Sequence, residues 1–122
     1  MLSDLEESKK IGEVKHLLTQ EKVCKIWLNY YLSEDYSVES LDFIRNTEIE
    51  AGGEKKRMFL FKCKLKEEDQ VYYVIVGPQP IDPNSFEINP TTVEWLEESE
   101  EPTAEQTAIL AKQYYEDSLK SE

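Results

Sequence analysis

Hydrophobic residues in the first quarter of the chain recur at the spacing of an amphipathic helix, three, four or seven positions apart. The stripe contains Ile11, Val14, Leu17, Leu18, Cys24, Leu28 and Tyr31. Ser3 and Glu6 fit a capping box, so we expect a helix that begins near Asp4 and ends by Leu32. One continuous helix and two shorter segments, the second capped by Thr19, both fit this pattern.

After residue 38 the helical spacing gives way to the alternation that is typical of strands. Residues 41–49 alternate, the glycine pair 52–53 supplies a turn, and residues 57–65 form a second strand. The continuous apolar run 71–76 is typical of a central strand that is covered on both faces or capped by a helix on its second face. We expect an antiparallel meander.

The second predicted strand divides its side chains between two faces, because successive residues of a strand point in opposite directions. The expected core face holds Phe59, Phe61, Cys63 and Leu65, and the opposite face holds Met58, Leu60, Lys62 and Lys64.

Prolines interrupt the pattern directly after the third predicted strand. Proline lacks the amide donor of a sheet ladder, so we expect residues 77–84 to form a loop that crosses the sheet edge or end. A short strand is expected at residues 86–88. Val93 and Trp95 alternate as in a further strand over residues 92–96, although a helix also fits this stretch.

The C-terminal part of the chain predicts a second helix. Residues 97–101 form an acidic hinge, and Thr103 and Gln106 fit a capping box before a helix over residues 104–119. The whole chain therefore predicts an α+β fold with an N-terminal helix packed on an antiparallel β-meander of about four strands, plus a C-terminal helix. We expect a single domain over residues 1–122, in which residues 97–122 are either integral or an appendage.

In the order of its elements, this arrangement resembles the cystatin and nuclear-transport-factor-like α+β rolls, in which a curved sheet wraps a long helix. The cystatin hairpin pattern Q-x-V-x-G is not found, and the nearest stretch, residues 47–52, departs from it at the glutamine and in the spacing. The resemblance concerns architecture alone, and it assigns no functional residue.

The chain of 122 residues has a net charge of −12, and most of the excess acids lie after residue 81. Residues 52–66 are basic instead, with Glu54 as their only acid. A negative field repels phosphate backbones, so we expect no nucleic-acid partner, and it steers the protein toward a basic surface.

Membrane insertion and secretion are not expected. The longest uncharged stretch, which contains residues 71–81, is shorter than the roughly 20 apolar residues that span a bilayer, and the N-terminus is acidic. Cys24 and Cys63 lack the spacing of a redox or zinc motif, so we expect both to pack as small hydrophobic residues in a reducing cytoplasm.

Residues with catalytic chemistry are sparse. His16 is the only histidine, which excludes metal sites built on several imidazoles within one chain, and its position suits the surface of a helix. Residues 51–56 contain glycines and lysines but lack the spacing of a phosphate-binding loop. We expect no cofactor and no metal, and a protein without catalysis, with an enzyme as the open alternative.

Three features offer candidate binding surfaces: an aromatic cluster at the end of the first helix, the proline segment and the acidic segment. Each also has a structural explanation, namely core packing, an ordinary crossover loop and a solvated tail. Their residues are Trp27, Tyr30, Tyr31, Pro78, Pro80, Glu97, Glu98, Glu100 and Glu101.

These observations favour a small interaction or regulatory module that binds a protein partner with a basic surface. The second hypothesis is a small-molecule-binding protein or enzyme, with a pocket between the helix and a curved sheet lined by Trp27, Tyr31, Phe59, Phe61 and Tyr73. A third is a DNA-mimic inhibitor. Homodimer formation through an edge strand or the C-terminal helix also remains open.

Overall fold

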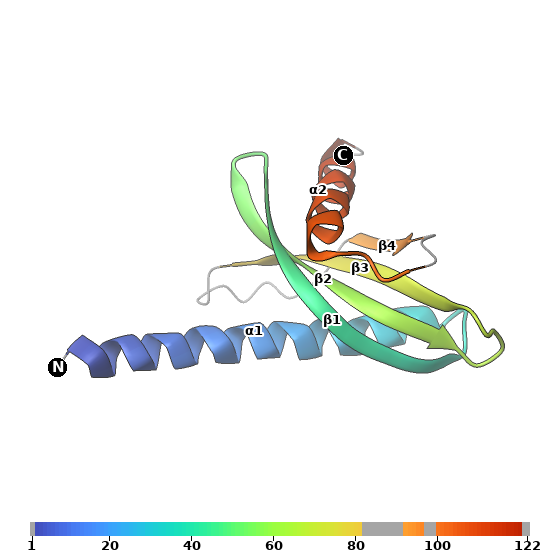
Figure 1. Cartoon of the computed structure of the whole chain (residues 1–122), viewed down its shortest axis with the longest axis horizontal. Coiled ribbons are helices and arrows are strands. Elements are labelled where there is room, and N and C mark those ends of the chain that lie inside the picture. The colour runs from blue at the N-terminus through green and yellow to red at the C-terminus, as the bar shows by residue number, and fades with distance from the viewer. Residues whose placement is uncertain (1, 82–91, 97–99, 121–122) are drawn as a thin grey trace.

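The structure of the chain is a computed structural model that describes residues 2–81, 92–96 and 100–120, with only the backbone for residues 2–16 and 51. A four-stranded antiparallel sheet has its strands in sequence order, and the two helices cover opposite faces of it (Figure 1). The predicted α+β fold is thus confirmed. Its elements are α1 (Leu2–Ser33), β1 (Val38–Ala51), β2 (Glu54–Leu65), β3 (Val71–Pro80), β4 (Thr92–Leu96) and α2 (Ala104–Lys120).

Helix α1 is one continuous helix rather than two segments. Its C-terminal half lies along the sheet, where Cys24, Leu28 and Leu32 are buried, and its N-terminal half extends past the sheet (Figure 1). Among the described residues, no helix has both the length and the hydrophobicity needed to cross a membrane.

Strand β2 supplies two hydrophobic cores at once. Phe59 and Phe61 pack beneath α1, whereas Met58 and Leu60 pack beneath α2, and all four are fully buried. The predicted alternation is therefore confirmed, but both faces of the strand are core faces. The sheet consequently lies between two helices, which differs from a roll that wraps a single helix.

The end of β3 corrects one prediction. Residues 77–80 are not a loop, because β3 continues through Pro80 and remains paired with β2. Strand β4 pairs with β3 only as far as Gly77, so Pro78 and Pro80 lie where one side of β3 has no paired neighbour among the described strands. A register shift between Arg57 and Phe59 accompanies this change. Prolines are tolerated at such edges and bulges because no ladder donor is needed there.

The predicted strand at residues 92–96 is confirmed as β4, and the short strand predicted at residues 86–88 lies outside the described residues. Helix α2 begins with the expected capping box. The backbone amide of Thr103 donates to Gln106 Oε1 over 3.0 Å, and the amide of Gln106 donates to Thr103 Oγ1 over 3.1 Å. Two orphan amides at the start of the helix are satisfied in this way.

The turn between β1 and β2 depends on Gly52 and Gly53, whose φ angles are 62° and 80°. Two adjacent residues with positive φ are required by the tight hairpin turns that match the twist of antiparallel strands. A Cβ atom on Gly52 would lie 3.7 Å from the side chain of Leu119, so the hairpin tip lies beside the C-terminal end of α2.

Candidate functional site

A groove lies at the end of the sheet where β2 turns into β3, and its volume is about 540 Å³. Three aromatic rings, two aliphatic side chains, one carboxylate and one amide form its walls. These residues are Tyr36, Leu65, Glu68, Gln70, Tyr72, Trp95 and Leu96.

Tyr36 reaches the groove from the connection between α1 and β1. Its backbone amide donates to the carbonyl of Leu32 over 2.8 Å, which closes the last turn of the helix. The amide of Lys66 donates to the carbonyl of Ser37 over 2.8 Å and ties the connection to the end of β2. These two bonds hold the tyrosine over the edge of the sheet.

Tyr72 and Trp95 come from neighbouring strands. Trp95 lies opposite Val74 in the register of β4 and β3, and Tyr72 is two residues before Val74 on the same face. Diagonal neighbours of this kind are within reach of aromatic side chains. The sheet register therefore brings the two rings together.

The three rings form a corner rather than a flat stack. The ring centroids of Trp95 and Tyr72 are 5.2 Å apart with their planes at 86°, and those of Trp95 and Tyr36 are 5.7 Å apart at 63°. The face of an aromatic ring carries partial negative charge. The steep angles therefore give the groove ring faces of different orientation.

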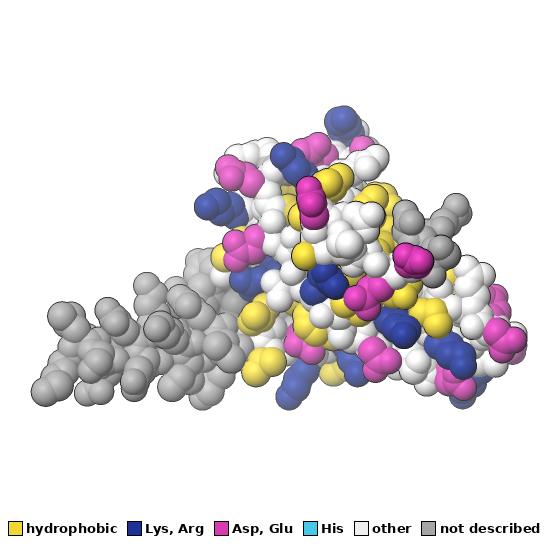
Figure 2. Space-filling view, viewed as in Figure 1, with side chains coloured by type: hydrophobic (Ala, Val, Ile, Leu, Met, Phe, Trp, Pro, Cys, Tyr) yellow, Lys and Arg dark blue, Asp and Glu magenta, His cyan; other side chains and the backbone are white. Residues whose placement is uncertain are grey.

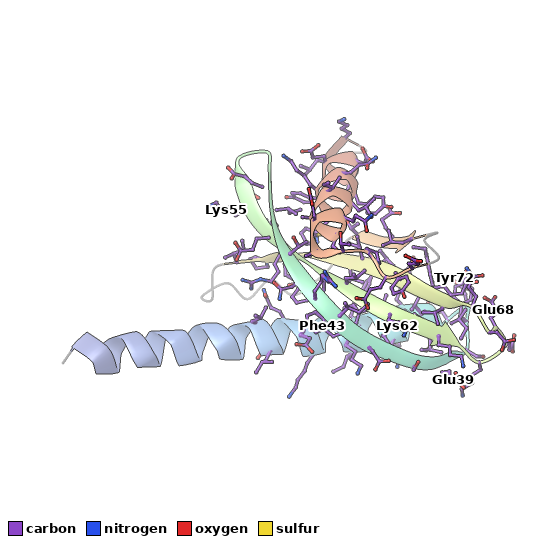
Figure 3. All side chains as sticks on the ribbon, in the orientation of Figure 1. Glu39, Phe43, Lys55, Lys62, Glu68 and Tyr72 are labelled. Atoms are coloured by element: carbon purple, nitrogen blue, oxygen red, sulfur yellow. The ribbon has the colours of Figure 1, made fainter. Side chains whose placement is uncertain are left out.

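Glu68 adds a full negative charge to the same groove. The hydroxyl of Tyr72 donates a short hydrogen bond to Glu68 Oε2, and Figure 3 shows both residues at the end of the sheet, remote from the hairpin tip that carries Lys55. This bond, together with partial desolvation and the charges of Glu68 and Tyr36, raises the pKa of Tyr72 above its ordinary value of 10. Tyr72 thus stays a neutral donor, and Glu68 stays oriented as an acceptor at the groove.

The predicted aromatic cluster lies elsewhere, on the surface of α1. The rings of Trp27 and Tyr31 stack with their centroids 5.2 Å apart and their planes at 12°. Trp27 is half-buried against the core, while Tyr31 is 47% and Tyr30 73% exposed. The two rings are therefore nearly parallel and lie on the outer surface of α1.

Phe61 and Tyr73 occupy opposite faces of the sheet. Phe61 is fully buried in the core beneath α1, and Tyr73 is buried in the core beneath α2. The structure therefore does not bring the five predicted lining residues to one pocket, since Tyr73 lies across the sheet from the core that holds Phe59 and Phe61. The five residues are Trp27, Tyr31, Phe59, Phe61 and Tyr73.

Pro78 is half-buried and Pro80 is buried near α1. Gln20 Nε2 donates to the carbonyl of Pro80 over 2.7 Å, and Arg57 Nη1 donates to Gln20 Oε1 over 3.0 Å. The end of β3 is thus linked to α1 through Gln20, which also bonds Arg57 of β2.

Of the predicted acidic residues, Glu97 and Glu98 lie outside the described residues, and Glu100 is exposed. Glu101 forms an ion pair of 3.2 Å with Arg45, which ties the segment before α2 to β1. That acid therefore anchors the C-terminal helix to the sheet.

The basic residues of β2 face acids of β1 across the ladder. Asp42 lies opposite Lys62 and Glu50 opposite Lys55, while Arg57 lies opposite Glu48 and forms an ion pair of 3.4 Å with it. Figure 2 shows acidic and basic side chains interspersed over the visible face of the sheet and α2. The register thus places acids of β1 beside much of the basic segment.

Both cysteines are free and fully buried, as the pattern predicts. Burial raises the pKa of Cys24 to about 12, an effect that the side chain of Gln79 partly opposes, and burial also raises the pKa of Cys63. Since the thiolate is the nucleophile and the metal ligand, neither group is poised for chemistry. Within the part of the chain that the structure describes, no cluster of three or more His, Cys, Asp or Glu side chains could hold a metal ion.

Sequence reasoning did not single out the residues of the groove. Tyr36, Tyr72 and Trp95 belong to three segments, a helix-to-strand connection and two strands. No local motif joins them, and only the register of β3 and β4 and the closure of the α1–β1 connection bring their rings together. The sequence feature that bears on the groove is the strand alternation, which places Tyr72 and Tyr73 on opposite faces of the sheet.

Comparison of the chain with protein-family models, with curated proteins and with solved structures gives no match.

Proposed function

We propose that this protein is a non-catalytic interaction module that binds a protein partner with a basic surface, and that the groove receives a cationic side chain of that partner. The observation that carries the proposal is the corner of Trp95, Tyr36 and Tyr72 with the carboxylate of Glu68 beside it. Aromatic faces and a carboxylate are the two groups that attract an organic cation most directly.

The expected energy of this contact is moderate. A cation over an aromatic face contributes about 0.5–1 kcal/mol at an exposed site and about 2 kcal/mol when it is desolvated. Two kcal/mol corresponds to roughly 30-fold in Kd. A net charge of −12 adds long-range attraction, which raises the association rate with a basic partner more than it raises the affinity.

A cytoplasmic location belongs to the same proposal. Two buried, unpaired thiols support a reducing compartment, where structural disulfides are rare. Neutralisation of the β2 bases by β1 acids supports a protein partner over a nucleic acid.

The test is calorimetric titration with an oligolysine peptide over a series of salt concentrations. An acidic protein attracts such a peptide over its whole surface, so the informative variant is one that alters the groove without altering the charge. Tyr36→Ala is suitable because Tyr36 is 48% exposed and contributes little to the core. Tyr30→Ala is the matched control, since Tyr30 is an exposed tyrosine on α1 outside the groove.

We expect Tyr36→Ala to weaken binding by roughly 3- to 30-fold, the range that cation–π energies allow, and Tyr30→Ala to leave it within about twofold. Affinity should also fall with added salt, because exposed charges are screened. If the peptide does not bind at low salt, or binds both variants as tightly as the unmodified protein, the proposal is wrong.

A further inference from the structure

We propose that the groove selects a trimethylated lysine side chain over an unmodified one. This inference rests on the proposed function, because it specifies which cation of a basic protein the groove accepts. The geometry points to it through three features: the angle between the rings, the placement of the acceptors on exposed side chains and the aliphatic lining.

The acceptors of the groove do not match a primary ammonium. Such a group carries three N–H donors, each of which needs an acceptor when it leaves water. Glu68 accepts a hydrogen bond from Tyr72 through Oε2, and the other carboxylate and amide oxygens of the lining, Glu68 Oε1 and Gln70 Oε1, belong to exposed side chains. A trimethylammonium group carries the same charge with no donors, so its transfer into the groove leaves none unsatisfied.

The walls of the groove match a group covered with methyls. Trp95 meets Tyr72 at 86° and Tyr36 at 63°, so a cation beside Trp95 lies among rings of different orientation. Leu65 and Leu96 supply aliphatic contacts in the same groove. Methyl groups gain dispersion contacts with these surfaces and bring the positive charge close to the rings.

A second aromatic pair in the same molecule provides an internal comparison. Trp27 and Tyr31 also lie near the surface, but their planes are at 12°, so each ring covers a face of the other. Among the ring contacts of the described residues, no third ring meets this pair. The chain has two tryptophans, so Trp95 reports on the corner and Trp27 reports on the parallel stack.

The experiment is a titration followed by the indole N–H signals of the two tryptophans in ¹⁵N-labelled full-length protein. Trp27→Phe removes one of the signals and thereby assigns both. The probes are Nα-acetyl-lysine amide, its Nε-trimethyl form and a neutral analogue in which carbon replaces the quaternary nitrogen. Small probes test the chemistry of the groove without requiring the sequence of a partner.

We expect the trimethyl probe to shift the Trp95 signal and to bind at least about tenfold more tightly than the unmodified and neutral probes, with the Trp27 signal unchanged. Tyr36→Ala should weaken this binding and Tyr30→Ala should not. An unchanged set of backbone amide signals away from the groove shows that the Tyr36→Ala variant is folded.

Three results would overturn the inference. Equal affinity for the trimethyl and unmodified probes would refute the methyl selectivity while leaving the proposed binding of a basic partner intact. Equal affinity for the trimethyl and neutral probes would show an apolar site that does not recognise charge. A trimethyl probe that moves neither the Trp95 signal nor that of a backbone amide in the groove would show that the corner is not the site, whether or not oligolysine binds elsewhere.

Discussion

Leu60 tests whether α2 is an integral part of the fold. Its side chain lies on the face of β2 that α2 covers, and it is fully buried. The buried residues of the same cluster are Ile49, Met58, Tyr73, Ile75, Leu96, Ala111 and Tyr115. Since Ala111 and Tyr115 belong to α2, Leu60 can be buried to this degree only while the helix is docked on the sheet.

The change Leu60→Ala removes three carbon atoms from this core. Buried leucine-to-alanine changes cost about 2–5 kcal/mol, depending on how far the surroundings collapse into the cavity. Collapse at Leu60 is restricted, because β2 is hydrogen-bonded to β1 on one side and to β3 on the other. We therefore expect a loss of about 3 kcal/mol.

Urea denaturation followed by far-ultraviolet circular dichroism measures this loss. With an m-value of about 1–3 kcal/mol per M, a loss of 3 kcal/mol lowers the midpoint by roughly 1–3 M. Ile109→Ala is the matched control, because Ile109 lies on the outer side of α2 and is 61% exposed. Its change should stay within about 0.5 kcal/mol.

A loss below about 0.5 kcal/mol for Leu60→Ala would refute the reasoning. It would mean that the face of β2 beneath α2 is hydrated in solution and that the helix is not packed there. A loss as large for Ile109→Ala would equally contradict it, since an exposed side chain has no cavity to leave.

Further predictions concern the groove, the thiols and the start of α2. Glu68→Ala should lower the pKa of Tyr72 toward 10, measured by the shift of its ring carbon with pH, because the variant lacks the acceptor and the charge that stabilise the phenol; an unchanged pKa would place the cause elsewhere. Cys24 and Cys63 should resist iodoacetamide at pH 8 until the protein is unfolded by urea. Because folded Cys24 keeps a proton that the unfolded chain loses near pH 9, the free energy of unfolding should fall between pH 9 and about 12, and Cys24→Ala should remove that part of the fall. Thr103→Ala should cost about 1 kcal/mol in urea denaturation, and Thr103→Ser should retain most of the stability, because serine restores the capping oxygen.

Local patterns in the sequence determine most of the elements. The helical stripe through Cys24 and Leu28, the alternation along β2 and the capping box at Thr103 each depend on residues a few positions apart. Such patterns fix which side of an element is apolar, and therefore where buried side chains such as Phe61 and both cysteines lie. The order of β1, β2 and β3 follows as well, because short turns join these consecutive antiparallel strands.

The tertiary structure alone decides which faces are covered and which distant residues meet. Burial of Leu60 depends on α2 folding back over the sheet, and the passage of β3 through Pro80 depends on where β4 stops. The groove depends on a register that places Trp95 diagonal to Tyr72 and on a connection that closes over both. These are long-range contacts, whose formation depends on the packing of the whole chain, and no short stretch of sequence encodes them.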